Sequence, residues 1–291
     1  MTSAESAYRR SLPSLPATGA LGYAGGRLTE VLWVAYRSLR KLSRNPFLLF
    51  FTLMMPIVWL GMFSQTFGTV FERAADLPGQ APPTYDYIAV LLPGIAVMSA
   101  IQSAAQSGFS MVSDIETGFM DKFLVAPISR GSVLIGKTLA DGIRMAAQTA
   151  IVLAIAFVFT LVFGWRIPFA TGVAGDAMIV LMTAGFGVAF AGLSNSVALF
   201  TKNTESTMAV SFTLTFPLLF LSTAMLPAGL LPPWLQTFSR FNPVSYVATA
   251  SRSLILTGFD WTQIGQAFLA IAIVGVLLYA LAVTAFRRQG R

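Results

Sequence analysis

Six long apolar stretches dominate this sequence of 291 residues. Each is about 20 to 25 residues long, the length that a helix needs to cross the roughly 30 Å hydrocarbon core of a bilayer. The stretches cover residues 47–68, 87–110, 138–163, 176–200, 207–226 and 263–286. Because a soluble domain of this size has no place to bury six such helices, the chain is predicted to fold within a membrane.

Charged residues make up 11% of the sequence, whereas soluble domains usually carry about a quarter. The stretches do not alternate between apolar and polar residues with a period of two, as the strands of a membrane β-barrel do. We therefore predict an all-α integral membrane protein of the cell membrane, with a six-span domain over residues 47–286. In the fourth stretch, small residues are predicted to let helices approach closely; they are Gly185, Gly187, Ala189, Ala191 and Gly192.

The sequence contains no cysteine and no histidine. Thiolate chemistry, disulfides, histidine-based acid–base catalysis and the usual zinc sites are therefore excluded. We expect no catalytic, cofactor-binding or metal-binding residue on this chain and no enzymatic activity of its own.

Positive charge is distributed unevenly among the segments between the spans. The net charge is +7, and fourteen of the 19 Lys and Arg residues lie in segments 1–46, 111–137, 200–206 and 287–291, against four in the alternate loops. Because cytoplasmic loops carry the excess of Lys and Arg, both termini are predicted to be cytoplasmic. The charge then serves orientation and contact with lipid headgroups, and we expect no nucleic-acid partner.

Three terminal segments lie outside the six-span domain. Residues 1–26 are rich in Ser, Pro, Ala and Gly and are predicted to be a disordered cytoplasmic tail. Residues 27–46 carry apolar residues at helical spacing, with Arg37 and Arg40 on the other face, which is typical of an amphipathic interfacial helix. This helix is either a basic anchor or a surface that also contacts a cytoplasmic partner. Residues 287–291 form a basic cytoplasmic tail.

The segment 227–261, between the fifth and sixth spans, is too polar and proline-rich to span but too apolar for a free loop. It is predicted to form two short helices, broken at Asn242-Pro243, that enter the outer leaflet and return. Such re-entrant backbone is tolerated where protein covers it. Trp234 and Tyr246 suit the aromatic belt at a membrane surface. The alternative interpretation is an amphipathic surface loop without a gating role.

The cytoplasmic stretch 111–137 contains a string that resembles a nucleotide-binding motif. Residues Gly131–Thr138 match G-x-x-x-x-G-K-T. That loop binds phosphate between a buried strand and a helix of a nucleotide-binding fold, for which this chain has no room. We therefore interpret the match as a coincidence and expect ATP hydrolysis on another polypeptide.

The same stretch also carries an amphipathic pattern. Phe119, Phe123 and Leu124 fall on one helical face, which ends at Pro127, and Glu116 precedes it. Aromatic side chains flanked by charges suit a contact with another protein. The alternative is a solvated loop.

The cytoplasmic stretch and two further segments resemble a known family, the permeases of ABC type-2 exporters. The resemblance is strongest to the daunorubicin-resistance and natural-product exporters. The order E-x-G-x-x-x-x-x-L-x-x-P-x-S-R, followed by G-K-x-L, is similar to the loop between the family's second and third spans. The matching residues are Glu116, Gly118, Leu124, Pro127, Ser129, Arg130, Gly136, Lys137 and Leu139. Tyr87 with Leu92-Pro93-Gly94, and Asn242-Pro243 with Tyr246 and Arg252, resemble two further family segments. Thr117 stands where the family often has arginine.

The resemblance implies a permease subunit that pairs with a second, identical or different permease subunit and with a dimer of ATP-binding cassette ATPase subunits, which bind ATP and Mg²⁺. It implies coupling to the ATPase through the cytoplasmic stretch and the interfacial helix, and an outer gate in the segment 227–261. The coupling residues would be Glu116, Gly118, Phe119, Leu124 and Pro127, together with Arg37 and Arg40. The gate residues would be Trp234, Asn242, Pro243 and Tyr246.

The apolar spans favour an amphipathic drug, lipid or natural product as cargo. Met54 and Met55 in the first span and Phe212 and Phe216 in the fifth are candidates for the pathway, although such an aromatic stripe also suits lipid contact or packing. Asp141 and Arg144 are predicted to pair near the cytoplasmic surface. Two alternatives remain: an ion-coupled carrier or channel, and a scaffold that recruits a cytoplasmic partner without transporting.

Overall fold

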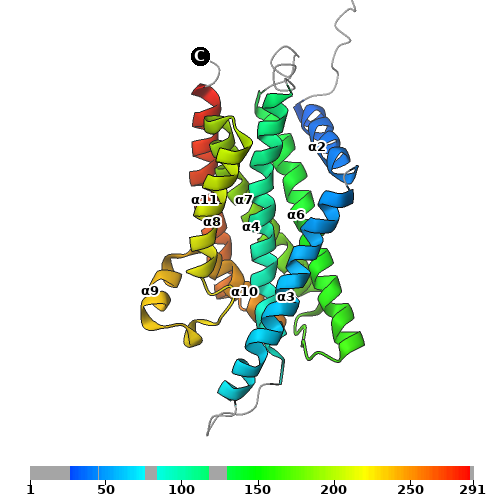
Figure 1. The fold of residues 1–291 in the computed structure, drawn as a ribbon, viewed down its shortest axis with the longest axis vertical. Coiled ribbons are helices and arrows are strands. Elements are labelled where there is room, and N and C mark those ends of the chain that lie inside the picture. Colours follow the sequence, from blue (N-terminus) through cyan, green and yellow to red (C-terminus); the bar gives the residue numbers. More distant parts are fainter. Residues whose placement is uncertain (1–26, 45, 76–83, 118–129, 289–291) are drawn as a thin grey trace, which may run out of the picture.

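The computed structural model describes residues 27–44, 46–75, 84–117 and 130–288. Within them every regular element is a helix (Figure 1). The elements are α2 (Arg27–Ser43), α3 (Pro46–Ala75), α4 (Tyr87–Glu116), α6 (Arg130–Phe163), α7 (Gly172–Thr201), α8 (Thr204–Phe220), η1 (Ala228–Leu230), α9 (Pro233–Phe241), α10 (Pro243–Leu256) and α11 (Trp261–Arg288). The predicted tail 1–26 lies outside the described residues, as do residues 289–291 of the predicted tail 287–291. Arg287 and Arg288 instead form the end of α11.

The long helices run up and down in a bundle (Figure 1). Helix α2, the last turns of α4 and α11 and the first turns of α6 lie at one end, which we call the α2 end. The last turns of α3 and α6 lie at the opposite end, with α9 at the side of the same half, and we call this half the α9 end. Within the part of the chain that the structure describes, five helices are long and apolar enough to cross a membrane: α3, α4, α6, α7 and α11. Helix α8 has 17 residues, which gives a length of about 26 Å. The prediction of an all-helical fold is confirmed for the described residues, and the sixth span remains a prediction.

Helix α4 forms the centre of the bundle. It packs against α3, α6, α7, α8 and α10, and 94% of its most apolar window is buried inside the chain. The corresponding windows of α3 and α11 are each 11% buried, so these two helices present most of their apolar surface outward. Surface of this kind faces lipid or another subunit.

Glycines allow the closest approaches between helices. A Cβ at Gly108 of α4 would lie 2.6 Å from the carbonyl oxygen of Ser194 on α7, and one at Gly187 of α7 would lie 2.5 Å from the sulfur of Met145 on α6. A Cβ at Gly192 would meet the α11 backbone at 3.2 Å. These distances confirm the predicted role of Gly187 and Gly192 in the fourth span. Close packing matters here because helices in lipid associate without a hydrophobic driving force.

Helix α2 packs along the first turns of α6. Val34 and Ala35 are buried, and a Cβ at Gly136 would lie 2.7 Å from the Cβ of Val34. The opposite face exposes the apolar side chains of Leu28, Leu32, Trp33 and Tyr36. A helix is therefore present over 27–43 of the predicted 27–46, with its buried stripe against α6, and Pro46 begins α3 instead. Its position at a membrane surface stays a prediction.

Several helix boundaries differ from the sequence-based expectation. Helix α3 continues to Ala75 rather than residue 68, and α7 begins at Gly172 rather than residue 176. Helix α4 continues to Glu116, and α6 begins at Arg130, so the connecting segment is shorter than 111–137. The string Gly131–Thr138 is consequently helical. Helix α8 ends at Phe220 rather than near residue 226, because Pro217 removes a helical donor and the hydroxyls beyond it bond to backbone. Ser222 Oγ, for example, donates to the Leu219 carbonyl at 2.6 Å.

The close approach of α4 to α7 gives a first testable prediction. We expect Gly108→Ala to lower the free energy of unfolding by about 1–3 kcal/mol, because the added methyl group must push Ser194 backbone away. Thermal unfolding of the detergent-solubilised protein measures this loss. Gly61→Ala in α3 is the matched control, because a Cβ there meets nothing within 4 Å. An equal destabilisation by both variants would contradict the close-packing argument.

Candidate functional site

A row of polar side chains lies between α4 and α6, starting at the α2 end. Lys137 on α6 forms an ion pair with Asp114 on α4, with 2.5 Å between Nζ and Oδ2. The exposed fractions of the two side chains are 10% and 7%. A buried charge is costly unless it is well paired, so separating the two helices here would leave two charges unpaired. The ion pair therefore holds α4 and α6 together beside the segment 118–129.

The row continues one turn deeper. Asp141 pairs with Arg144 at 3.1 Å, as the sequence predicts. Ser107 on α4 donates to the Asp141 carboxylate, and Arg144 donates to the Ser103 carbonyl at 2.6 Å. Asn195 on α7 lies 3.1 Å from the Ser107 hydroxyl. The side chain of Ser107 and the backbone of Ser103 on α4 thus hydrogen-bond the charged pair, while Arg144 Nε is buried without a partner among the described residues.

Gln148 ends the row on α6. Its amide oxygen accepts a hydrogen bond from Ser103, and its amide nitrogen donates to the Thr52 carbonyl of α3 at 3.2 Å. Lys137, Asp141, Arg144 and Gln148 recur at spacings of four, three and four residues, which places them on one face of α6. We call this set of residues, with their partners on α4, the polar seam.

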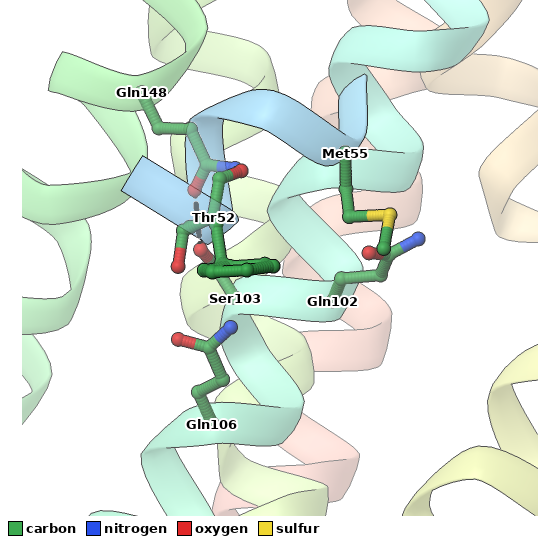
Figure 2. Close-up of a pocket in the computed structure, with 7 residues that line it drawn as sticks. Thr52, Met55, Gln102, Ser103, Gln106 and Gln148 are labelled. Carbon is green, nitrogen blue, oxygen red and sulfur yellow. Dashed lines mark hydrogen bonds between the residues drawn. The ribbon is translucent and has the colours of Figure 1, made fainter. Parts of the chain in front are cut away.

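A pocket opens beside the inner part of the polar seam, between α3, α4 and α6 (Figure 2). Its volume is about 180 Å³. It is lined by Phe51, Thr52, Met55, Gln102, Ser103, Gln106 and Gln148. Figure 2 shows the side chains of Met55 and Gln102 on one side of the pocket, and Gln148 and Ser103, joined by their hydrogen bond, on the other. None of the lining side chains carries a charge.

The α9 end is held together by buried polar contacts. The Arg252 side chain on α10 donates to the carbonyls of Val90 at 3.0 Å and Thr223 at 2.7 Å. A Cβ at Gly94 would lie 1.7 Å from the Ala224 carbonyl oxygen, so glycine is required where α4 meets this turn. Tyr87 OH donates to the Met225 carbonyl at 2.9 Å. The turn after α8 is thus attached to both α4 and α10.

Asn242 connects α8, α9 and α10. Its side-chain oxygen caps α10 by accepting from Val244 N at 3.0 Å, and its amide nitrogen donates to the Leu218 carbonyl of α8 at 2.6 Å. The predicted break at Asn242-Pro243 is confirmed, since α9 ends at Phe241 and α10 begins at Pro243. Trp234 is 59% exposed, and Tyr246 OH donates to the Arg240 carbonyl at 2.6 Å.

The predicted coupling residues are only partly described. Glu116 is the last residue of α4, and Thr204 Oγ1 lies 3.5 Å from its carboxylate. Gly118, Phe119, Leu124 and Pro127 lie outside the described residues. Arg37 and Arg40 lie on α2, and each has an interaction partner.

The predicted pathway residues lie in two different places, on α3 and on α8. Met55 lines the α3–α4–α6 pocket, and Met54 is exposed beside it on α3. Phe212 and Phe216 are exposed on α8, where their rings lie 6.2 Å apart. Both helices pack on α4, but the two pairs do not line one pocket.

The sequence analysis missed the glutamines of the pocket and the partner of Lys137. A signal was present: Gln102-Ser103 and Gln106-Ser107 repeat four residues apart within an apolar span. Polar residues at that spacing share a helix face and mark an inward-facing surface in a membrane. Among the described residues, no group of acidic side chains could hold a metal ion.

Comparison with known proteins decides the family. Residues 29–256 match the family model described as "ABC-2 type transporter". The chain belongs to the ABC-2 type transporter family. As a member of it, this permease is a multi-pass membrane protein, and the family implies an ATP-binding cassette subunit as its partner.

Several relatives are permeases by name. The permease is 29% identical over 222 residues to the daunorubicin resistance ABC transporter permease protein DrrB1 of Streptomyces coeruleorubidus, covering 76% of this chain and 72% of the relative. It is 28% identical over 269 residues to the putative transport permease ycf38 of Cyanophora paradoxa, covering 87% and 88%. It is 29% identical over 168 residues to the probable doxorubicin resistance permease DrrC of Mycobacterium tuberculosis H37Rv, covering 58% of each chain.

The ion pair at the α2 end gives a second prediction. We expect Asp114→Leu to lower the free energy of unfolding of the permease by about 3–5 kcal/mol, because it leaves the Lys137 ammonium buried without its carboxylate. The double variant Asp114→Leu/Lys137→Met should recover most of the loss, since no charge is then buried. Chemical unfolding in detergent followed by tryptophan fluorescence measures both.

The matched control is Arg166→Met, which breaks an exposed ion pair to Asp86 in which the Arg166 side chain is 61% exposed. We expect a cost of at most about 1 kcal/mol there. If the double variant is as unstable as Asp114→Leu alone, the loss does not come from an unpaired buried charge.

Proposed function

We propose that this permease is the membrane subunit of an ATP-driven exporter that moves an amphipathic drug, lipid or natural product out across the cell membrane. The observation that carries the proposal is the polar seam, which binds α4, before the segment 118–129, to α6, after it, through one ion pair and the hydrogen bonds of Asp141 and Arg144. A force applied to that segment reaches two helices that are tied together by buried charges. Those helices also form two walls of the α3–α4–α6 pocket.

The energy for transport would come from separate ATPase subunits. ATP binding would close a dimer of cassette ATPase subunits against the segment that includes Gly118, Phe119, Leu124 and Pro127, with Glu116 at its start. Differential contact of that segment with the two ATPase states supplies the coupling free energy. Because packed helices switch between discrete arrangements, a small displacement at the α2 end can open and close a path deeper in the bundle.

The proposed membrane arrangement has six spans with both termini in the cytoplasm. Helix α8 is the additional span, and its length of about 26 Å is completed by the turn held at Arg252. Helices α9 and α10 then form the re-entrant outer segment, with Trp234, Asn242, Pro243 and Tyr246 at the outer gate. The contacts of Asn242 to α8 and α10 support a gate whose parts move together.

A second permease subunit, identical or different, would complete the pore. The exposed apolar surfaces of α3 and α8, on either side of α4, support this, because one chain leaves them without a protein neighbour among the described residues. The names of the relatives from Streptomyces and Mycobacterium, which refer to daunorubicin and doxorubicin resistance, support a drug or natural product as cargo.

Reversal of the charge at Glu116 tests the coupling. We expect Glu116→Lys to lower ATP-dependent uptake of doxorubicin or a fluorescent phospholipid into inside-out vesicles roughly tenfold, which corresponds to about 1.4 kcal/mol of lost coupling. Phe119→Ala should act in the same direction through the same contact. The matched control is Glu205→Lys at the exposed start of α8, which makes the same charge change at the same end of the bundle. Unchanged uptake in both Glu116→Lys and Phe119→Ala would refute the coupling role.

A further inference from the structure

The two glutamines of the α3–α4–α6 pocket lie deep within a membrane-spanning helix. Gln102 is 15 residues from the start of α4 and 14 from its end, about 21–22 Å from each. At this depth a bilayer offers no water to a polar group, so polar side chains of membrane helices face a protein partner or a polar cavity.

Neither glutamine has such a partner in the part of the chain that the structure describes. The side-chain oxygen of Gln106 is buried and accepts no hydrogen bond. The Gln102 amide likewise makes none with a described residue. Their neighbour Gln148, by contrast, uses both its oxygen and its nitrogen, on Ser103 and Thr52. The pocket is thus lined by two amides one turn apart that have donors and acceptors without a described partner.

The rest of the lining defines the chemistry of an occupant. Phe51 supplies a flat aromatic wall and Met55 a polarisable thioether, both of which suit contact with a ring. No charged side chain lines the pocket, and burial of an ion there would lack a counter-charge. Its volume of about 180 Å³ is close to that of an apolar cavity that accepts benzene, about 150 Å³.

From this geometry we infer that the α3–α4–α6 pocket is a binding site for one ring-sized, uncharged, hydroxyl- or carbonyl-bearing part of the cargo, held by the amides of Gln102 and Gln106. The ring stacks on Phe51 and contacts Met55, and its oxygen substituents bond to the two amides. Phe51 and Met55 are 45% and 48% exposed, so an amphipath dissolved in the membrane reaches the pocket past α3. The inference rests on the proposed function in that it makes this ligand the exported molecule.

Three photoreactive probes of one size test the inference. They are trifluoromethyl-phenyldiazirine, its benzyl alcohol derivative and its benzoate derivative, applied to the permease with its ATPase subunits in lipid nanodiscs. We expect the alcohol to label the pocket segments of α3 and α4 more strongly than the other two. Gln102→Leu and Gln106→Leu should each lower labelling by the alcohol about threefold to tenfold, the effect of one lost hydrogen bond. Labelling by the parent hydrocarbon should not fall.

The control variant is Gln266→Leu, which makes the same change at an exposed position of α11 and should leave all labelling unchanged. Equal labelling of the pocket by the alcohol and the hydrocarbon, insensitive to both pocket variants, would overturn the inference. Stronger labelling by the benzoate would also overturn it, because the pocket would then select an anion.

A second measurement asks whether protein fills the pocket in the assembled transporter. The sequence has no cysteine, so Gln106→Cys introduces a single thiol. We expect this thiol to react with a small uncharged maleimide and to be protected by the benzyl alcohol probe, at a concentration about threefold to tenfold higher because one of the two amides is lost. Failure to react, or an oxidative cross-link between two permease subunits, would mean that a subunit covers the pocket, which refutes a ligand site.

The experiments distinguish failure of the proposed ligand site from failure of the proposed export function. If ATP-dependent uptake of doxorubicin is present while labelling ignores Gln102→Leu and Gln106→Leu, the export function stands and the ligand site fails. If the glutamine variants lower labelling as expected while no ATP-dependent uptake of doxorubicin or phospholipid occurs, the ligand site stands and the export function fails.

Discussion

Polar side chains on membrane helices must find their partners inside the protein, because hydrocarbon offers none. In this permease the polar seam meets that requirement, because polar groups of α4 and α6 bond to one another there. Asp114 pairs with Lys137, Ser107 donates to Asp141, Arg144 donates to the Ser103 carbonyl, and Ser103 donates to Gln148. Because each contact would be costly to leave unmade, the seam fixes the rotation and the register of α6 against α4. The pocket exists as a consequence, since its walls are those two helices and α3.

Helix α4 extends the influence of the seam to the other end of the bundle. At the α2 end it carries Asp114 and Glu116, and at the α9 end it carries Tyr87 and Gly94, which contact the turn after α8. Arg252 links that same turn to the Val90 carbonyl. A single buried helix therefore joins the cytoplasm-facing segment of the proposed exporter to its proposed gate. Its many close contacts favour movement as a rigid unit.

Some of the site could be predicted from the sequence because it depends on local patterns. The helix break at Asn242-Pro243 follows from proline and from the capping ability of asparagine. The pair Asp141–Arg144 follows from a spacing of three on one helix. The pairing of Lys137 with Asp114 could not be predicted, because it joins residues 23 apart across two helices. A one-residue turn of either helix would separate them, and no local pattern specifies that rotation.

The sequence by itself determined that this protein folds in a membrane, that it is helical, and where most of its helices break. Those properties follow from hydropathy summed along the chain and from prolines, each of which acts within a few residues. The tertiary structure alone decided which inward-facing polar groups are satisfied and which, like the amides of Gln102 and Gln106, are left for a ligand. That choice depends on how neighbouring helices are rotated and how closely they approach, as Gly108 shows against Ser194, and close packing across the whole bundle sets both.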